Sequence, residues 1–249
     1  VSVIHEEEKL EWAFLNSKKN SKSGRVLVEE FLYGPQISTE SIILDGECHT
    51  IGFADRNYEY LEKFAPYIIE NGGELPSFLD FETQLAVNKI IEKASISMGV
   101  LNGVVKGDIV IFENQPYIIE IATRLSGGYF CSHEIPLSTG VDFIGNAIKM
   151  CMGESIDVED LKPKYHKFIS QRYLFTRDGV IDSIEGINLL EQNPKIKFFN
   201  IHIEPGQRVF NATNHRSRAG MVIASGDSRE NAIFNAVSAI NDIKINYQD

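Results

Sequence analysis

The sequence predicts an α+β fold in which helices are mixed with antiparallel hairpins. Two β-rich runs, residues 38–44 and 49–56, are joined by Asp45-Gly46, which is the strongest short hairpin signal. Two further runs, residues 109–112 and 117–122, flank a short polar turn. Because hairpins and helices are mixed along the chain, this class fits better than a doubly wound parallel sheet.

The first part of the chain alternates between helices and strands. The expected elements are a helix over 6–17, a strand over 25–32, the first hairpin, a loop at 71–73, a helix over 81–98, the second hairpin and a helix over 142–152. In the helix over 81–98, Val87, Ile91, Ala94 and Met98 recur at helical spacing and predict one buried face.

The second part follows a polar linker over residues 157–167. Its expected elements are strands over 168–176, 180–184, 197–203 and 220–224 and a helix over 228–243. Ile233, Val237 and Ile240 form the apolar face of that helix, and Asp227 or Ser228 caps it. We therefore expect two domains, residues 1–155 and 165–249.

Composition narrows the classes of partner. The 249 residues carry 24 basic and 35 acidic side chains, a net charge of −11, which argues against a nucleic-acid partner. No apolar run is long enough to predict a membrane span. Three scattered cysteines form neither a metal-ligand spacing nor a disulfide framework, which is typical of a cytoplasmic protein.

Asp108 and Glu120 are the most informative pair. A turn centred near Asn114 places them directly opposite each other on one face of the second hairpin, where like charges destabilise a sheet. A divalent cation between them reverses that effect, and Mg²⁺ binds through one or two carboxylates plus substrate phosphates. Arg124 then faces the same site. Two alternatives stay open: an exposed hairpin with scattered acids, and a one-residue slip that separates the pair.

Three stretches resemble those of ATP-grasp enzymes. Residues 26–41, VLVEEFLYGPQISTES, are similar to the hinge strand of the superfamily, and residues 117–128, YIIEIATRLSGG, to its metal-binding strand and following loop. Residues 218–232, RAGMVIASGDSRENA, are similar to the C-terminal domain of the L-amino acid ligase branch. The resemblance covers nearly the whole chain. It implies an ATP-grasp domain of antiparallel sheets and flanking helices, present in part over residues 1–155, plus a small α+β C-terminal domain.

The resemblance implies that ATP is bound along the hinge strand. Main-chain groups of Glu29 and Leu32 would contact adenine, and the side chain of Glu29 or Glu30 would reach the exocyclic amine or the ribose. The other residues implied on the nucleotide side are Phe31, Gln36, Glu40, Arg56 and Lys106. Gln36 stands where relatives often carry a ribose-binding Glu, and Glu40 is expected to face the phosphates or to support the residues that do.

The resemblance also implies a site for Mg²⁺, or Mn²⁺, with Asp108 and Glu120 as its acidic ligands. Ala122 departs from the Asn found there in many relatives. Arg124 matches the arginine that orients the acyl phosphate or the substrate carboxylate, as its planar guanidinium allows. The implied reaction is a two-step ligation: a carboxylate attacks the γ-phosphate of ATP, and an amine then displaces phosphate from the acyl phosphate.

Several alternatives remain at this point. A carbamoyl-phosphate-synthase-like or carboxylase-type enzyme, and a non-catalytic nucleotide-binding fragment, are the rival functions. The phosphate-binding Lys, the glycine-rich loop and the N-terminal domain of the family do not lie in these residues. We therefore expect a C-terminal portion with little or no ligase activity alone, with carboxylate and amine substrates and a missing N-terminal segment or separate subunit as partners. A homodimer formed through an open strand edge is a further alternative.

Overall fold

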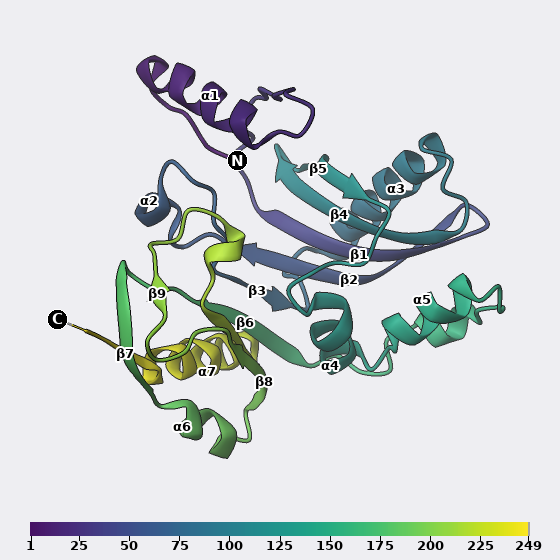
Figure 1. The fold of residues 1–249 in the computed structure, drawn as a ribbon. Coiled ribbons are helices and arrows are strands. Elements are labelled where there is room, and N and C mark those ends of the chain that lie inside the picture. Colours follow the sequence, from purple (N-terminus) through teal and green to yellow (C-terminus); the bar gives the residue numbers. More distant parts are fainter. Residues whose placement is uncertain (249) are drawn as a thin grey trace.

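A computed structural model describes residues 1–248 as one large antiparallel sheet with flanking helices and a smaller second sheet (Figure 1). The large sheet has eight strands in the order β5-β4-β1-β2-β3-β6-β10-β8. Their bounds are β1 Gln36–Leu44, β2 Glu47–Asn57, β3 Gly72–Leu75, β4 Gly103–Phe112, β5 Gln115–Ala122, β6 Phe168–Leu174, β8 Ile196–Ile201 and β10 Gly220–Gly226. The second sheet has the order β11-β7-β9, with β7 Gly179–Glu185, β9 Arg208–Val209 and β11 Lys244–Tyr247. The α+β prediction is confirmed.

The helices flank these sheets. They are α1 Leu10–Asn20, α2 Leu61–Phe64, α3 Phe81–Ser97, α4 Ile135–Thr139, α5 Phe143–Cys151, α6 Ile187–Gln192 and α7 Arg229–Asp242. Short 3₁₀ turns occur at Glu7–Lys9, Val158–Leu161 and His215–Ser217, and a π-helical turn at Phe130–Glu134. Among the described residues, no helix is both long and apolar enough to cross a membrane.

Both predicted hairpins are present in the predicted registers. Leu44 pairs with Glu47 across the first turn, and Phe112 pairs with Gln115 across the second. Asp45 and Gly46 both have positive φ, as the favoured two-residue hairpin turn requires, and Glu113 and Asn114 have the same conformation.

The two faces of β1 and β4 carry different kinds of side chain, because successive side chains of a strand point to opposite faces. Ile37, Ile43, Val105 and Ile109 pack with α3 on one face. Their neighbours one residue away, including Ser38, Lys106 and Asp108, line a cavity on the other face. The period of two along each strand thus separates the core from the polar site.

Two predicted elements were wrong. Residues 25–32 form no strand: within residues 1–248 they pair with no other strand, so Leu27 is 84% exposed and Val28 is 73% exposed. Residues 71–73 were expected to form a loop, but Gly72 and Gly73 are the first two residues of β3, which is buried between β2 and β6. A Cβ on Gly72 would lie 2.1 Å from the carbonyl oxygen of Gln171, so glycine permits the close approach of these strands.

The helices predicted over 81–98, 142–152 and 228–243 agree with α3, α5 and α7 within one residue at each end, whereas the helix predicted over 6–17 is displaced to Leu10–Asn20. The buried faces agree only in part. In α3, Val87 and Ile91 are buried as expected, whereas Met98 is 48% exposed. In α7, the buried residues are Ala232, Ala236 and Ala239 rather than the expected face of Ile233, Val237 and Ile240, which are only partly buried. The small side chains let α7 lie close to β6 and β10, and packing distance therefore overrides hydrophobicity in selecting the buried stripe.

The large sheet runs through both predicted domains, because β3 of the first part pairs with β6 of the second. A buried ionic cluster lies at this junction. Arg172 of β6 pairs with Glu74 of β3, and their side chains are 5% and 6% exposed. Arg229 of α7 adds a second cation, 2.6 Å from Asp55 of β2 and 3.3 Å from Glu74. The two parts of the chain are thus held together by backbone pairing and by mutually neutralised charges.

Arg172→Met is expected to lower the free energy of unfolding by about 3 kcal/mol or more, because it leaves a buried carboxylate short of a counter-charge. Urea unfolding followed by circular dichroism measures the change. Arg208→Met, at an exposed position of β9, is the matched control and should change stability by only about 0.5 kcal/mol. Equal stability of Arg172→Met and the unaltered protein would show that the cluster does not hold the junction.

Candidate functional site

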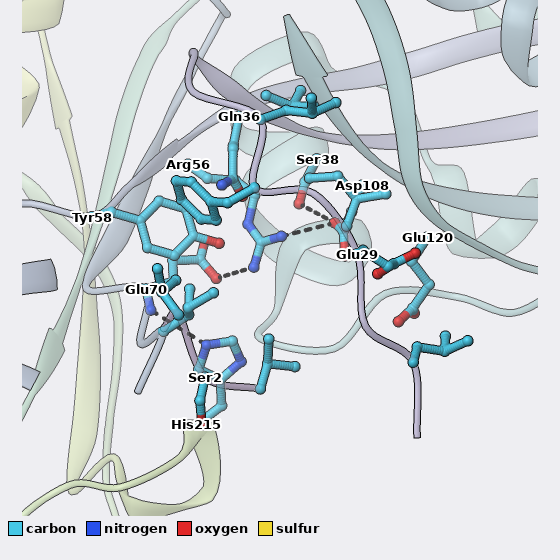
Figure 2. Close-up of a pocket in the computed structure, with 18 of the residues that line it drawn as sticks. Ser2, Glu29, Gln36, Ser38, Arg56, Tyr58, Glu70, Asp108, Glu120 and His215 are labelled. Carbon is cyan, nitrogen blue, oxygen red and sulfur yellow. Dashed lines mark hydrogen bonds and ion pairs between the residues drawn. The ribbon is translucent and has the colours of Figure 1, made fainter. Parts of the chain in front are cut away.

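A cavity of about 1130 Å³ lies over the face of the sheet opposite α3. Its lining comes from the N-terminal segment and α1, from the irregular segment before β1, from β1, β2, β4 and β5, from the loop after β5, and from residues in or next to β3, β6 and β10. Figure 2 shows part of this lining. Of the residues predicted for the site, the cavity brings together Glu29, Glu30, Phe31, Leu32, Gln36, Arg56, Lys106, Asp108, Glu120 and Arg124. Glu40 is the exception.

Asp108 and Glu120 are directly opposed partners on β4 and β5, as predicted. The register shifts immediately after Asp108, so the pair lies beside a bulge. The Asp108 side chain is 13% exposed, and its Oδ1 accepts a hydrogen bond of 3.1 Å from Ser38 Oγ and lies 3.1 Å from an Arg56 nitrogen (Figure 2). Lys106 pairs with its other carboxylate oxygen. These contacts fix the orientation of the carboxylate at the cavity wall.

Glu120 and Arg124 form the more open side of the site. A nitrogen of Arg124 lies 3.7 Å from Glu120 Oε1, and the two side chains are 56% and 58% exposed. Arg124 also donates a hydrogen bond to the Leu125 carbonyl oxygen. Both side chains can therefore turn toward a ligand at little cost, whereas Asp108 is held in place.

The donor set fits a hard divalent cation. Two carboxylates face one cavity, and the described part of the chain has no group of three or more His, Cys, Asp or Glu residues arranged to hold a metal ion. Mg²⁺ suits such a set, because it commonly takes one or two carboxylates and completes its shell with water and phosphate oxygens. Ala122 contributes no ligand atom.

An alternating chain of charges continues from Asp108 into the cavity. Arg56 bridges Asp108 and Glu70, with 3.1 Å to each carboxylate, and Arg218 lies 3.3 Å from Glu70 Oε2. Burial lowers the pKa of His215 to about 4, with Arg218 adding to the effect, and its neutral Nε2 accepts the Glu70 backbone N–H. The sequence indicated no role for Glu70 or His215, because neither residue belongs to a recognisable motif.

Glu40 lies beneath the loop after β5 and does not line the cavity. It is fully buried, and its carboxylate accepts hydrogen bonds from the backbone N–H and the hydroxyl of Ser126. Burial raises the pKa of Glu40 to about 7 against those hydrogen bonds. Its position indicates that it holds the Ser126-Gly127-Gly128 loop in place rather than contacting a phosphate.

The hinge residues lie at the cavity without regular structure. Residues 25–33 are irregular, and the chain returns to the sheet at Gly34, where a Cβ would lie 1.9 Å from the Ile111 carbonyl oxygen. An adjoining hollow of about 280 Å³ is lined mainly by apolar and aromatic side chains, among them Phe31, Leu32 and Tyr58. Its apolar and aromatic lining suits the flat ring of a ligand.

The raised pKa of Glu40 makes stability depend on pH. The folded protein keeps a proton that the unfolded chain releases above pH 4.5, so stability falls as the pH rises from about 4.5 to about 7. Glu40→Gln removes this loss, and relative to the unaltered protein it should gain up to about 3 kcal/mol across that interval. Urea unfolding at pH 5 and pH 8 measures the difference. A difference that is constant with pH, as we expect for the exposed control Glu47→Gln, would contradict this account.

Part of the sequence matches a known protein family, and most of it matches a curated protein. The family model for L-amino acid ligase C-terminal domain 2 matches residues 172–248. The curated relative, the uncharacterized protein y4rH of Sinorhizobium fredii, is 26% identical over 222 residues, which are 88% of this chain and 44% of that protein. The chain thus spans less than half the length of that relative.

Solved structures match the whole chain. The L-amino acid ligase from Bacillus licheniformis matches with a TM-score of 0.84 and 18% identity, over 100% of this chain and 61% of that one. Phosphoribosylglycinamide synthetase from Anaerococcus prevotii matches with a TM-score of 0.76 and 17% identity, over 98% and 61%. Biotin carboxylase from Campylobacter jejuni, solved with an ATP analogue, matches with a TM-score of 0.68 and 17% identity, over 97% and 54%. The chain therefore has the ATP-grasp fold of these enzymes, and residues 172–248 match the family model of an L-amino acid ligase C-terminal domain.

Proposed function

We propose that this chain is part of an ATP- and Mg²⁺-dependent ligase that joins a carboxylate to an amine through an acyl phosphate. The observation that carries the proposal is the opposed pair Asp108 and Glu120, which shares a cavity with Arg124. The match of residues 172–248 to an L-amino acid ligase domain supports the ligase over a carboxylase. Under this proposal, residues 1–155 are the ATP-grasp part and residues 165–249 the C-terminal domain.

The nucleotide would lie between the hinge segment and the sheet. Phe31 and Leu32 line the apolar hollow that suits adenine, and main-chain groups of residues 29–32 are not engaged in a sheet. Glu29, Glu30 and Gln36 lie at the same cavity, where they are available to the amine and hydroxyl groups of a nucleoside.

Asp108 and Glu120 would hold Mg²⁺, which when bound neutralises phosphate charge during transfer. Lys106 and Arg56 lie on either side of Asp108 and add positive charge where the phosphates would lie. Arg124 would orient the reacting carboxylate through its planar guanidinium. The proposed chemistry needs no protein nucleophile, since phosphoryl transfer depends on positioning and on charge neutralisation.

The proposed substrates are a small carboxylate and an amine. A further segment or a separate subunit would contribute the phosphate-binding Lys and the glycine-rich loop that the superfamily uses. Activity would then require both parts, while nucleotide binding at the carboxylate pair is testable on this chain.

Calorimetric titration of a non-hydrolysable ATP analogue with and without Mg²⁺ tests the proposal. We expect Mg²⁺-dependent binding, and a loss of about tenfold or more in the Asp108→Asn/Glu120→Gln variant, because each charged contact contributes about 1.5–3 kcal/mol. The control is Asp182→Asn/Glu191→Gln, which removes two exposed carboxylates of the C-terminal part and should bind normally. Binding that is independent of Mg²⁺ and unchanged in the first variant would overturn the metal assignment.

A further inference from the structure

The inner end of the cavity holds a carboxylate without a counter-charge. Glu134 ends the π-helical turn Phe130–Glu134, is only 3% exposed, and lines the cavity. Within residues 1–248, no hydrogen bond or ion pair reaches its side chain, and no cation acts on its pKa. Burying an unpaired carboxylate costs free energy of folding. Its presence beside a cavity therefore indicates a role in binding a ligand.

The surroundings of Glu134 are negative. Burial raises its pKa well above the ordinary value, and the charges of Glu70 and Glu74 raise it further. Those two neighbours have partners of their own: Glu70 pairs with Arg56 and Arg218, and Glu74 with Arg172 and Arg229. Glu134 is therefore the one carboxylate of this group whose ionised form is balanced by no cation among the described residues.

The wall beside Glu134 is rigid and leaves that charge facing the cavity. The Arg218 guanidinium lies 3.5 Å from the centre of the Tyr173 ring and also pairs with Glu70, with no contact to Glu134. Gln171 donates a hydrogen bond of 2.6 Å to the Gly128 carbonyl oxygen, and a Cβ on Gly128 would lie 2.7 Å from the Tyr173 hydroxyl. Arg56 and Arg218, which line the same cavity, are paired with Glu70 rather than with Glu134, so a cationic group of a ligand can supply the missing counter-charge.

We propose that Glu134 binds an ammonium group carried by a substrate at the inner end of the cavity. This inference rests on the proposed ligase function, and it adds a substrate-binding residue to it. Residues 124–134 run along the cavity from Arg124, beside the proposed reacting carboxylate, to Glu134. An ammonium fits better than a divalent metal ion, because Glu134 offers a single carboxylate and its acidic neighbours Glu70 and Glu74 are already paired with arginines. An amine held as a cation cannot attack a carbonyl carbon, so this group is distinct from the amine that reacts.

Titration with small probes followed by NMR tests the assignment. With Mg²⁺ and a non-hydrolysable ATP analogue present, n-butylamine should bind the unaltered protein and should bind Glu134→Gln about tenfold or more weakly. Butyrate, which has no ammonium group, should bind both proteins equally. Glu47→Gln removes an exposed carboxylate at the start of β2 and is the matched control, in which n-butylamine binding should be unchanged.

The pH dependence gives a second readout on the unaltered protein. Binding of n-butylamine should strengthen as the pH rises through the raised pKa of Glu134, because only the ionised carboxylate pairs with the cation, up to about pH 9, where the amine still carries its charge. The titratable groups coupled to Glu134 are Glu70, Glu74, Tyr173 and Cys131. Glu134→Gln should remove this pH dependence.

Three results would overturn the assignment. One is equal n-butylamine binding by the unaltered protein and Glu134→Gln, another is binding that does not vary with pH, and the third is no binding of n-butylamine to the unaltered protein. If Mg²⁺-dependent nucleotide binding persists in those cases, only the role of Glu134 fails and the proposed ligase stands. Loss of Mg²⁺-dependent nucleotide binding would instead count against the ligase itself.

Discussion

The walls of the cavity are connected by a row of ion pairs with alternating charge. The row runs from Lys106 through Asp108, Arg56 and Glu70 to Arg218. These side chains are between 11% and 17% exposed, so each charge is held mainly by its neighbours rather than by water. Removing one member of such a chain leaves another buried and unpaired, which is far more costly than losing a surface ion pair. These ion pairs join β4 to β2, to the segment before β3 and to the segment before β10. The ion pairs therefore link the positions of the elements that form the cavity walls.

This coupling divides the cavity into two ends with different properties. At the outer end, Glu120 and Arg124 are more than half exposed and can adapt to a ligand. At the inner end, Tyr173 and Glu134 are almost fully buried and are held by a packed wall. A site of this kind can accept a large polyphosphate on the open side while selecting a small group on the closed side, since selectivity depends on what the rigid wall leaves unpaired.

Local sequence signals predicted the parts of the fold that depend on neighbouring residues. The Asp45-Gly46 turn fixed the register of the first hairpin. Asp108 and Glu120 were correctly predicted to lie opposite each other, but the pairing depends on the bulge after Asp108, since the Phe112–Gln115 pair alone would place Asp108 opposite Ile119. Long-range packing decided the remainder. Glycine in residues 71–73 indicates a loop locally, but it is required where β3 lies between two strands, and the alanine stripe of α7 follows from its closeness to the sheet. Glu70, His215 and Glu134 join the site only through tertiary contacts, and no spacing in the sequence brings them together.

The four-residue strand β3 stands between the strands that carry Asp108 and those that carry Tyr173. Adjacent strands of a sheet are rotated relative to one another, and this rotation accumulates across the sheet. The angle between the two walls of the cavity is thus set at its shortest shared strand, where only a few backbone hydrogen bonds resist a change in twist. A side chain at Gly72, where a Cβ would lie 2.1 Å from the Gln171 carbonyl oxygen, would push β3 and β6 apart and so change the angle between the two walls of the cavity.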